Sequence, residues 1–250
     1  MKIVYIVAAA SLSAALSVQA AEVVAPAGFA NALGNGQSTR PLRNYGTGGS
    51  RYQQVYNSGL FGAFGAQESI TSIAFRAKQK PLLTFIGTSV TVSNIQIRLS
   101  TTAKTDAQGL DVTFANNVGA NVQLVYSGPL ALTTSAATAG TSAFDYLITL
   151  QNAFTFAKGA GNLLLDITIP DSAVVSGNGS IGFAQFDTVT DTFPSADGIS
   201  SAFGSTGSGA IGSNSTTGLV TRFTSTTVPS AGGATVLAMA GLGSIRRRRA

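Results

Sequence analysis

Apolar residues recur at every second position in several stretches of the chain, and this spacing constrains the fold more than any other feature. The most regular run is Leu163, Leu165, Ile167 and Ile169, which ends at Pro170. Alternation at period two places one face of a β-strand against a core and the other toward water. A proline cannot continue a strand ladder. The middle of the chain is therefore predicted to consist of strands.

Seven more stretches read as strands, and loops rich in Gly, Ser, Thr and Asn separate them. They are 52–56, 72–76, 95–99, 122–126, 144–150, 181–186 and 219–224. In one of them the predicted apolar face is Val122, Leu124 and Tyr126. Eight short strands with turn-rich connections favour an all-β fold over 50–227, an antiparallel, jelly-roll-like β-sandwich. A β-helix is the alternative.

The N-terminus has the three parts of a secretory signal peptide. Lys2 gives a positive start, residues 3–16 an apolar centre, and Val18 and Ala20 are small residues at the two positions that specify cleavage. An apolar run of about 14 residues is short for a bilayer-spanning helix. We therefore expect residues 1–20 to form a signal helix that signal peptidase removes after Ala20, so that the chain is exported.

The net charge of +5 is confined to the ends of the chain. Lys2 and the four arginines of the C-terminus account for five of the fifteen basic residues, which leaves ten basic against ten acidic residues. A body without net positive charge does not attract a polyanion, so no nucleic-acid partner is expected. The chain also has no cysteine, so its stability must come from packing and not from disulfide bonds.

Residues 228–250 form a tail with three parts in a fixed order. Pro229 separates the tail from the folded body. Residues 231–245 are uncharged, and as a helix they would be about 22 Å long, shorter than a typical hydrocarbon core. Arginines at the extreme end stay on the cytoplasmic face of a membrane. A plain tail anchor or an amphipathic helix of the fold are the alternatives.

This tail resembles the PEP-CTERM sorting signal, which exosortases process in the envelope of many Gram-negative bacteria. The residues that carry the resemblance are Val228, Pro229, Ser230, Arg246, Arg247, Arg248 and Arg249. The usual Val-Pro-Glu-Pro is here Val-Pro-Ser-Ala. The resemblance implies an exosortase-like partner, transient anchoring in the membrane by a short hydrophobic helix, and location in the envelope or outside the cell, with exopolysaccharide as a further candidate partner.

The body is similar, over short stretches, to a group of exported proteins that carry such tails and have no assigned activity. The stretches are 51–56, 73–76, 99–102 and 161–166. This similarity implies the cellular location and the architecture of the protein, but no enzymatic reaction.

The composition excludes several kinds of catalysis. Without His or Cys, the chain cannot form Ser-His-Asp or Cys-His sites, nor the usual zinc and copper sites. A glycosidase would need two carboxyl groups across a sugar, and Asp145 with Asp166 is the pair to consider. Both are expected on the outward face of neighbouring strands, where ordinary surface aspartates lie, and the chain has no Trp to stack a sugar. We expect no enzymatic activity.

Calcium is the one cofactor for which the sequence offers ligands. Asp187, Asp191 and Asp197 lie in an oxygen-rich stretch with several threonines and no nearby cation. Hard cations bind such oxygen ligands in loops, although the spacing matches no known calcium repeat. Ordinary solvated loop acids are the alternative.

Two polar segments flank the predicted strands. Residues 21–49 form a lead that either adds an edge strand or remains loose, and residues 205–217 read as a long surface loop or a disordered insertion. For the whole chain we expect an exported, non-enzymatic structural or matrix protein. The alternatives are a carbohydrate-binding module, with Tyr52, Tyr56 and Tyr126 as stacking residues, and a secreted carboxylate-dependent hydrolase.

Overall fold

The structure, a computed structural model, describes seven stretches of the chain: 20–42, 49–78, 89–134, 141–177, 185–192, 194–206 and 211–228. Within them the chain is all-β, with antiparallel strand pairs throughout and only single turns of 3-10 helix, as the alternating pattern predicts. The predicted signal helix before Ala20 and the tail after Val228, with Pro229, Ser230 and the four arginines, lie outside the described residues.

The strands form three sheets. They are β1 (Ala20–Ala25), β2 (Gly36–Ser38), β3 (Ser50–Tyr56), β4 (Gln67–Phe75), β5 (Ser89–Thr102), β6 (Gln123–Thr133), β7 (Tyr146–Ala157), β8 (Asn162–Ile169), β9 (Val175–Gly177), β10 (Phe186–Thr190), β11 (Ile199–Gly204), β12 (Ser213–Ser215), β13 (Thr217–Leu219) and β14 (Thr221–Thr227). Among the described strands, sheet A has the order β1-β14-β4-β7, sheet B the order β13-β10-β2, and sheet C the order β12-β11-β3-β8-β5-β6, with β9 also on β5.

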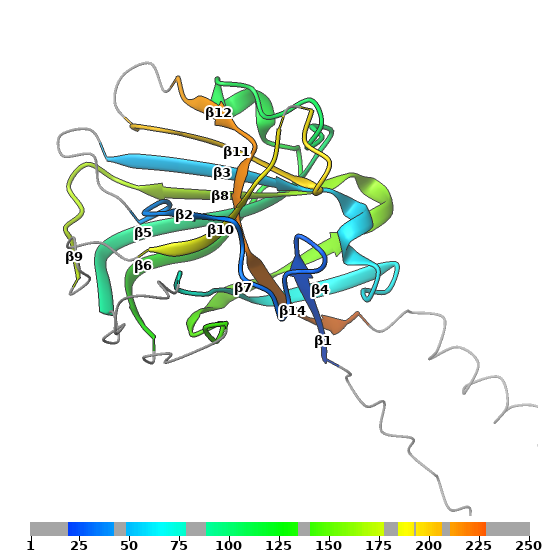
Figure 1. Ribbon diagram of the computed structural model, residues 1–250, viewed down its shortest axis with the longest axis horizontal. Helices are drawn as coiled ribbons and strands as arrows, with labels where there is room; N and C mark the ends of the chain where they lie inside the picture. The colour runs from blue at the N-terminus through cyan, green and yellow to red at the C-terminus, as the bar shows by residue number, and fades with distance from the viewer. Residues whose placement is uncertain are drawn as a thin grey trace, which may run out of the picture.

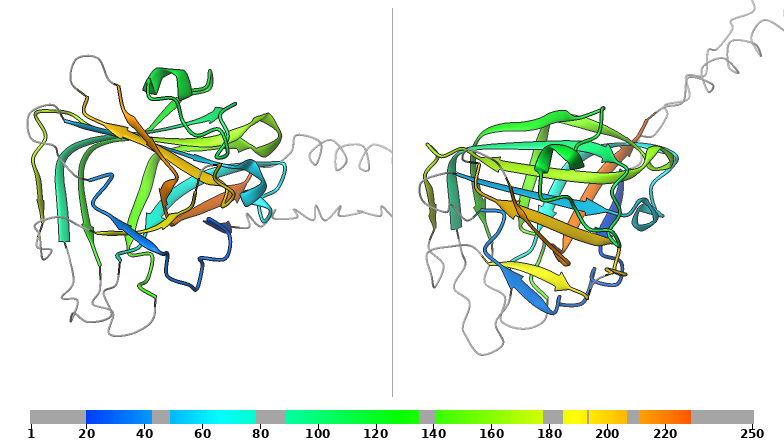
Figure 2. Two further views of the ribbon diagram at one scale, coloured as in Figure 1. Left: turned by 45° about the horizontal axis from the view of Figure 1, so that its top comes forward. Right: turned by 90° about the horizontal axis from the view of Figure 1, so that it is seen from above.

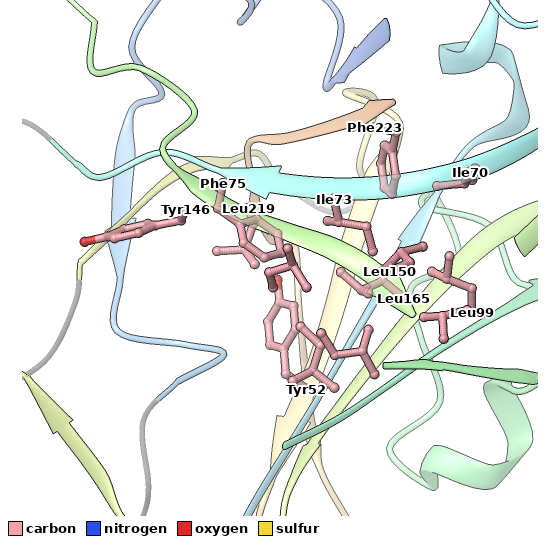
Figure 3. Close-up of a cluster of buried hydrophobic side chains, with 14 of the residues drawn as sticks. Tyr52, Ile70, Ile73, Phe75, Leu99, Tyr146, Leu150, Leu165, Leu219 and Phe223 are labelled. Atoms are coloured by element: carbon pink, nitrogen blue, oxygen red, sulfur yellow. The ribbon is translucent and has the colours of Figure 1, made fainter. Parts of the chain in front are cut away.

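One contiguous apolar core joins sheets A and C. Ile73 on β4 and Phe223 on β14 belong to the same buried cluster as Leu99 on β5 and Leu165 on β8 (Figure 3). In Figure 1 the long strands β3, β5 and β8 cross the upper part of the molecule, and β1, β4 and β14 lie below them. The predicted inward faces of β5, β7 and β8 are the faces that pack in this core.

Sheet C is also covered on its other face. A second, smaller cluster consists of Val55, Leu164 and Ala202 from the sheet and Leu110 and Phe114 from the loop that precedes β6. Figure 2 shows this loop, with its 3-10 turn, over the outside of the sheet. Because both faces are packed, the outward residues Leu164 and Asp166 in the middle of β8 are buried like the inward ones, whereas Asn162 and Thr168 near its ends are half-buried.

The predicted face of β6 is wrong at Val122 and Leu124, although Tyr126 packs against the core as expected. Val122 and Leu124 are 44% and 39% exposed, whereas Val125 is fully buried. The pairing of β5 with β6 shifts register between Ile97 and Arg98. A shift of one residue moves every side chain of a strand to the other face, and the sequence pattern of β6 alone carries no sign of it.

The polar segments contain strands that the alternating pattern does not reveal. In the lead 21–49, β1 forms the edge of sheet A against β14, and β2 pairs with β10. In 205–217, β12 pairs with β11. Of the stretch predicted over 181–186, residues 181–184 lie outside the described part of the chain, and Phe186 begins β10. The stretch predicted over 219–224 is divided between β13 and β14.

We predict that Phe223→Ala destabilises the protein by about 3–5 kcal/mol, because the ring leaves a cavity in a packed core. Its ring lies 4.9 Å from that of Tyr56 and 5.4 Å from that of Phe61, centroid to centroid. Urea unfolding measures the loss. Thr224→Ala, at the next position on β14 and on the opposite face, is the control and should cost much less; equal losses would contradict the placement of β14.

Candidate functional site

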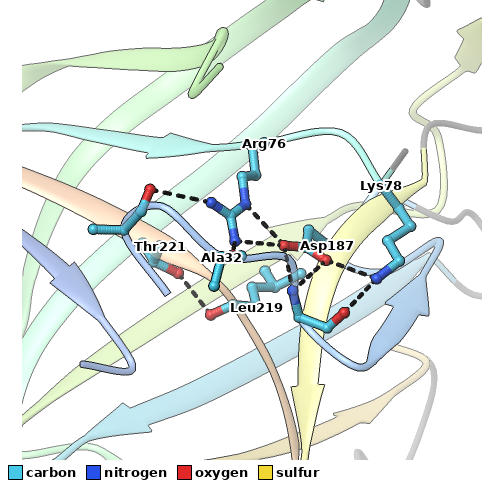
Figure 4. A network of polar contacts seen from close by, with 8 residues as sticks. Ala32, Arg76, Lys78, Asp187, Leu219 and Thr221 are labelled. Atoms are coloured by element: carbon cyan, nitrogen blue, oxygen red, sulfur yellow. Dashed lines mark hydrogen bonds and ion pairs between the residues drawn. The ribbon is translucent and has the colours of Figure 1, made fainter. Parts of the chain in front are cut away.

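Asp187 lies at the centre of a buried ion cluster. Its carboxylate accepts hydrogen bonds from Arg76 Nε at 2.8 Å and from the backbone N–H of Gly34 at 3.0 and 3.1 Å. Lys78 Nζ lies 3.1 Å from the second oxygen. The side chains of Asp187 and Arg76 are fully buried (Figure 4). The prediction that Asp187 is a loop acid with no cation nearby is wrong, because its two cations come from a segment more than a hundred residues earlier in the chain.

The cluster attaches the polar lead to the sheets. The Arg76 guanidinium also donates to the carbonyl oxygens of Ala30 and Ala32, and Lys78 Nζ donates to that of Gly34. Every oxygen of the Asp187 carboxylate is therefore engaged by a protein donor. Such a carboxylate serves the fold and has no position open for a metal ion.

We predict that Asp187→Asn costs about 3–5 kcal/mol, since it leaves a buried guanidinium without its counter-charge. Chemical unfolding at neutral pH measures the loss. The matched control is Glu22→Gln. It removes a partly exposed ion pair with Arg222, in which the nitrogen and oxygen lie 3.9 Å apart, and it should cost no more than about 1 kcal/mol. A loss as small as that of the control would contradict a structural role for the cluster.

The other two predicted calcium ligands lie in the loop between β10 and β11. Asp191 accepts hydrogen bonds from the backbone N–H groups of Ala196 and Thr192, which lower its pKa. Burial raises the pKa of Asp197, although hydrogen bonds from the Ile199 N–H and the Ser195 hydroxyl oppose that effect.

The structure does not bring the three aspartates together. Asp187 is held in the ion cluster, while Asp191 is close enough to Asp197 for its charge to raise the pKa of the latter further. In the part of the chain that the structure describes, no group of three or more acidic residues is placed to hold a metal ion. The predicted calcium set is therefore not supported by the geometry.

We predict that Asp197→Asn stabilises the protein at neutral pH. A carboxyl whose pKa is raised by folding costs stability as the pH rises above its unfolded value. The asparagine keeps the Oδ1 acceptor and replaces Oδ2, which is buried without a hydrogen-bond partner, with a donor. The melting temperature should exceed that of the wild type at pH 7, and the difference should vanish below the ordinary aspartate pKa.

The control for this change is Asp111→Asn, which should act in the opposite direction. Hydrogen bonds from the Thr113 N–H and from Asn116 lower the pKa of Asp111. Its charge therefore stabilises the fold fully above the ordinary aspartate pKa, and this contribution is lost as the pH falls from there through the lowered pKa of the folded state. Shifts of the same sign in both variants at pH 7 would refute this assignment.

A cleft lies where β2, β10, β11 and β12 meet. It has two adjoining cavities of about 220 and 330 Å³, which share Arg40 and Phe203 in their walls. The guanidinium carbon of Arg40 lies 3.1 Å from the centroid of the Phe203 ring, so the two groups stack. The smaller cavity is lined by Gln37, Ser38, Arg40, Tyr52, Thr188, Ser201, Phe203, Asn214, Ser215 and Thr217.

The walls of this cleft are polar and carry one kind of charge. Among the lining residues, all in the described part of the chain, Arg40 is the charged one, and none is a carboxylate. Gln37 and Asn214 are exposed, and their side-chain amides make no hydrogen bond with another described residue. Thr188 is fully buried, and its hydroxyl has no hydrogen-bond partner there. The groups that the cleft presents unused are therefore the amides of Gln37 and Asn214, since the Thr188 hydroxyl lies below its surface.

Two of the three tyrosines considered for sugar stacking belong to the core. Tyr56 is fully buried with its hydroxyl 2.8 Å from that of Thr221, and Tyr52 is 4% exposed with its hydroxyl on Gln54. Burial raises the pKa of both hydroxyls well above the usual range. Tyr126 is half-buried and donates to the Pro129 carbonyl oxygen. The aromatic ring that lines a cavity beside a cation is Phe203, which the alternating pattern does not single out.

The pair of aspartates considered for glycoside hydrolysis does not lie on neighbouring strands. Asp145 precedes β7 in sheet A, whereas Asp166 is on β8 in sheet C. Asp166 is buried beneath the loop that covers the outer face of sheet C. Its carboxylate accepts a hydrogen bond from Arg51 Nε at 2.9 Å and another from the Gln53 side-chain amide at 2.9 Å. The prediction that it faces solvent is wrong, because a covering loop is a tertiary feature that strand periodicity cannot reveal.

Comparison of the chain with protein-family models, with curated proteins and with solved structures found no match. No helix in the described stretches is long and apolar enough to cross a membrane.

Proposed function

We propose that the chain is an exported, non-enzymatic protein of the cell envelope or extracellular matrix. Signal peptidase removes residues 1–20 after Ala20. The tail 228–250, read by an exosortase-like enzyme, holds the protein transiently in the membrane, with Arg246, Arg247, Arg248 and Arg249 on the cytoplasmic side. The body outside the membrane serves a structural role, with exopolysaccharide as a candidate partner.

The observation that carries this proposal is the pairing of the first described strand with the last. Ala20 pairs with Thr226, and Ala25 with Thr221, along the β1–β14 ladder. Cleavage after Ala20 leaves residues 21–25 of β1 in place, and β14 ends at Thr227, one residue before the tail. The predicted signal peptide and the predicted sorting tail therefore join the folded body at its two borders. Removal of both would leave the folded body almost intact.

The use of the buried acids supports a role without catalysis. Asp187 is neutralised in the ion cluster, and Asp166 is paired with Arg51. The buried Glu68 accepts hydrogen bonds from the Ser225 hydroxyl and from the Gly65 N–H. These carboxylates hold strands and loops together, which favours a structural protein over a carboxylate-dependent hydrolase.

The architecture that fits this role is a jelly-roll-like β-sandwich of sheets A and C. The shared core between the two sheets and the absence of parallel pairs among the described strands support it. The signal helix at 1–20 and the short hydrophobic helix of the tail would flank the sandwich at one end.

The C-terminal arginines provide the test. Replacement of the four with glutamine should alter release from the cell surface, whereas replacement with lysine should preserve it because the charge is retained. Cell fractionation and intact-mass analysis of the native protein measure location and both termini. A native mass that includes residues 1–20, or unchanged processing and location of the glutamine variant, would overturn the proposal.

A second candidate, a carbohydrate-binding module, is favoured by the cleft at Arg40 and Phe203. Sugar sites combine an aromatic or cationic surface with side chains that both donate and accept hydrogen bonds. The cleft offers both kinds of group, and it lies in the folded body, so this function is compatible with export.

A further inference from the structure

We infer that Asn214 is a modification site and carries an N-linked oligosaccharide on its side-chain nitrogen, Nδ2. This inference goes beyond the proposed function, but it rests on the export of the chain, because the acceptor pattern for such sugars is used in secreted proteins. It does not depend on how the tail is processed, nor on sugar binding by the cleft.

The sequence at Asn214 matches the acceptor pattern for N-linked sugars, which is Asn-x-Ser/Thr with x other than proline. The pattern occurs twice in the chain, at Asn178-Gly179-Ser180 and at Asn214-Ser215-Thr216. The first occurrence lies outside the described residues. A short pattern also arises by chance in a chain rich in Asn, Ser and Thr, so the surroundings of Asn214 carry the inference.

The Asn214 side chain is exposed and its amide is free. It is the middle residue of β12, the edge strand of sheet C, which has its ladder with β11 on one side. The amide makes no hydrogen bond with another described residue. In contrast, the amide groups of Asn35, Asn117 and Asn162 all donate to backbone carbonyl oxygens. A bulky substituent on Asn214 would therefore break no hydrogen bond of the described fold.

The third residue of the pattern indicates when the sugar is added. The Thr216 hydroxyl is buried in the fold and donates to the Asp191 carbonyl oxygen. An enzyme that reads the asparagine and the threonine together needs both side chains uncovered. We therefore expect the transfer to take place before folding, as the chain leaves the membrane, and the completed fold to be a poor acceptor.

The transfer exchanges one bond at the anomeric carbon of the sugar. The donor is an oligosaccharide joined to a lipid through a diphosphate, and a membrane-bound transferase supplies the catalysis. Asn214 Nδ2 forms a bond to the anomeric carbon as the bond from that carbon to the diphosphate oxygen breaks. The lipid diphosphate leaves with the bonding electrons, and Nδ2 gives up one of its two protons to solvent. No oxidant or reductant is needed.

The cleft provides room beside Asn214 for the first sugar. Asn214 lines the cavity of about 220 Å³ together with Gln37 from β2. The free amide of Gln37 can donate to one sugar hydroxyl and accept from another. An oligosaccharide on Asn214 would thus begin at the cleft that the second candidate function uses.

Mass spectrometry of the native protein, isolated from the cells that produce it, tests the inference. Trypsin alone leaves Asn178 and Asn214 in one peptide, because no Lys or Arg lies between Lys158 and Arg222. Additional cleavage before aspartate separates the two asparagines, since three aspartates lie between them. We expect the peptide that contains Asn214 to carry the added mass of an oligosaccharide.

Variants assign the sugar to Asn214. Asn214→Gln keeps an amide but removes the acceptor, so this peptide should lose all of its added mass. Thr216→Ser keeps both the pattern and the buried hydroxyl, and it should retain the sugar. Asn94→Gln, at an exposed asparagine of β5 outside the pattern, is the control and should change nothing. Melting temperatures close to that of the wild type would show that all three variants fold.

Other outcomes overturn the inference. A bare Asn214 in the native protein does so whatever the masses of the two termini, which decide the export proposal separately. Sugar on Asn178 alone has the same consequence. Added mass that persists in Asn214→Gln would place the sugar on a Ser or Thr hydroxyl instead.

Discussion

The buried charge of Asp187 is the interaction on which the arrangement of the sheets depends. A carboxylate and a guanidinium without contact to water are tolerated only when nearly every donor and acceptor is satisfied. Here the donors come from Arg76 directly after β4, from Lys78 two residues further on and from the lead before β2, while the carboxylate itself is on β10. The backbone adds two hydrogen bonds at the same place. The Asp187 N–H donates to the Arg76 carbonyl oxygen, and the Val220 N–H donates to the Asp187 carbonyl oxygen. Sheets A and B are therefore joined at this point by charge and backbone together.

The same cluster positions one wall of the cleft. Gly34 approaches β10 so closely that a Cβ atom would lie 2.1 Å from the Thr188 carbonyl oxygen, and this approach lets its N–H reach Asp187. The chain then runs directly into β2, which carries Gln37, and on to Arg40. The exposed polar side chains of the cleft thus depend on a buried ionic contact several residues away. The wall of the cleft on the three-stranded sheet B is held in place in this way, against the wall that β11 and β12 of sheet C provide.

The sequence predicts the strands that have one apolar face. It does not predict strands or ion pairs that depend on contacts between distant segments. The inward faces of β5, β7 and β8 follow from alternation alone. β2 and β12 do not, because three-residue polar strands have no periodic signal. The partners of Asp187 and Asp166 are separated from them by 111 and 115 residues, so a local pattern cannot assign either ion pair. Arg40 belongs to the one dense charged feature of the lead, but nothing in the sequence relates it to Phe203.

The central position of β14 has a mechanical consequence. This strand lies between β1 and β4 and has backbone ladders on both sides. A tension applied at Thr227 along the strand axis would load the hydrogen bonds of both ladders in shear, all at once, instead of peeling them one by one. In Figure 1, β12 at the cleft lies on the opposite side of the body from the end of β14. A force transmitted across the body to Thr227 would therefore act on a strand that two ladders hold in place.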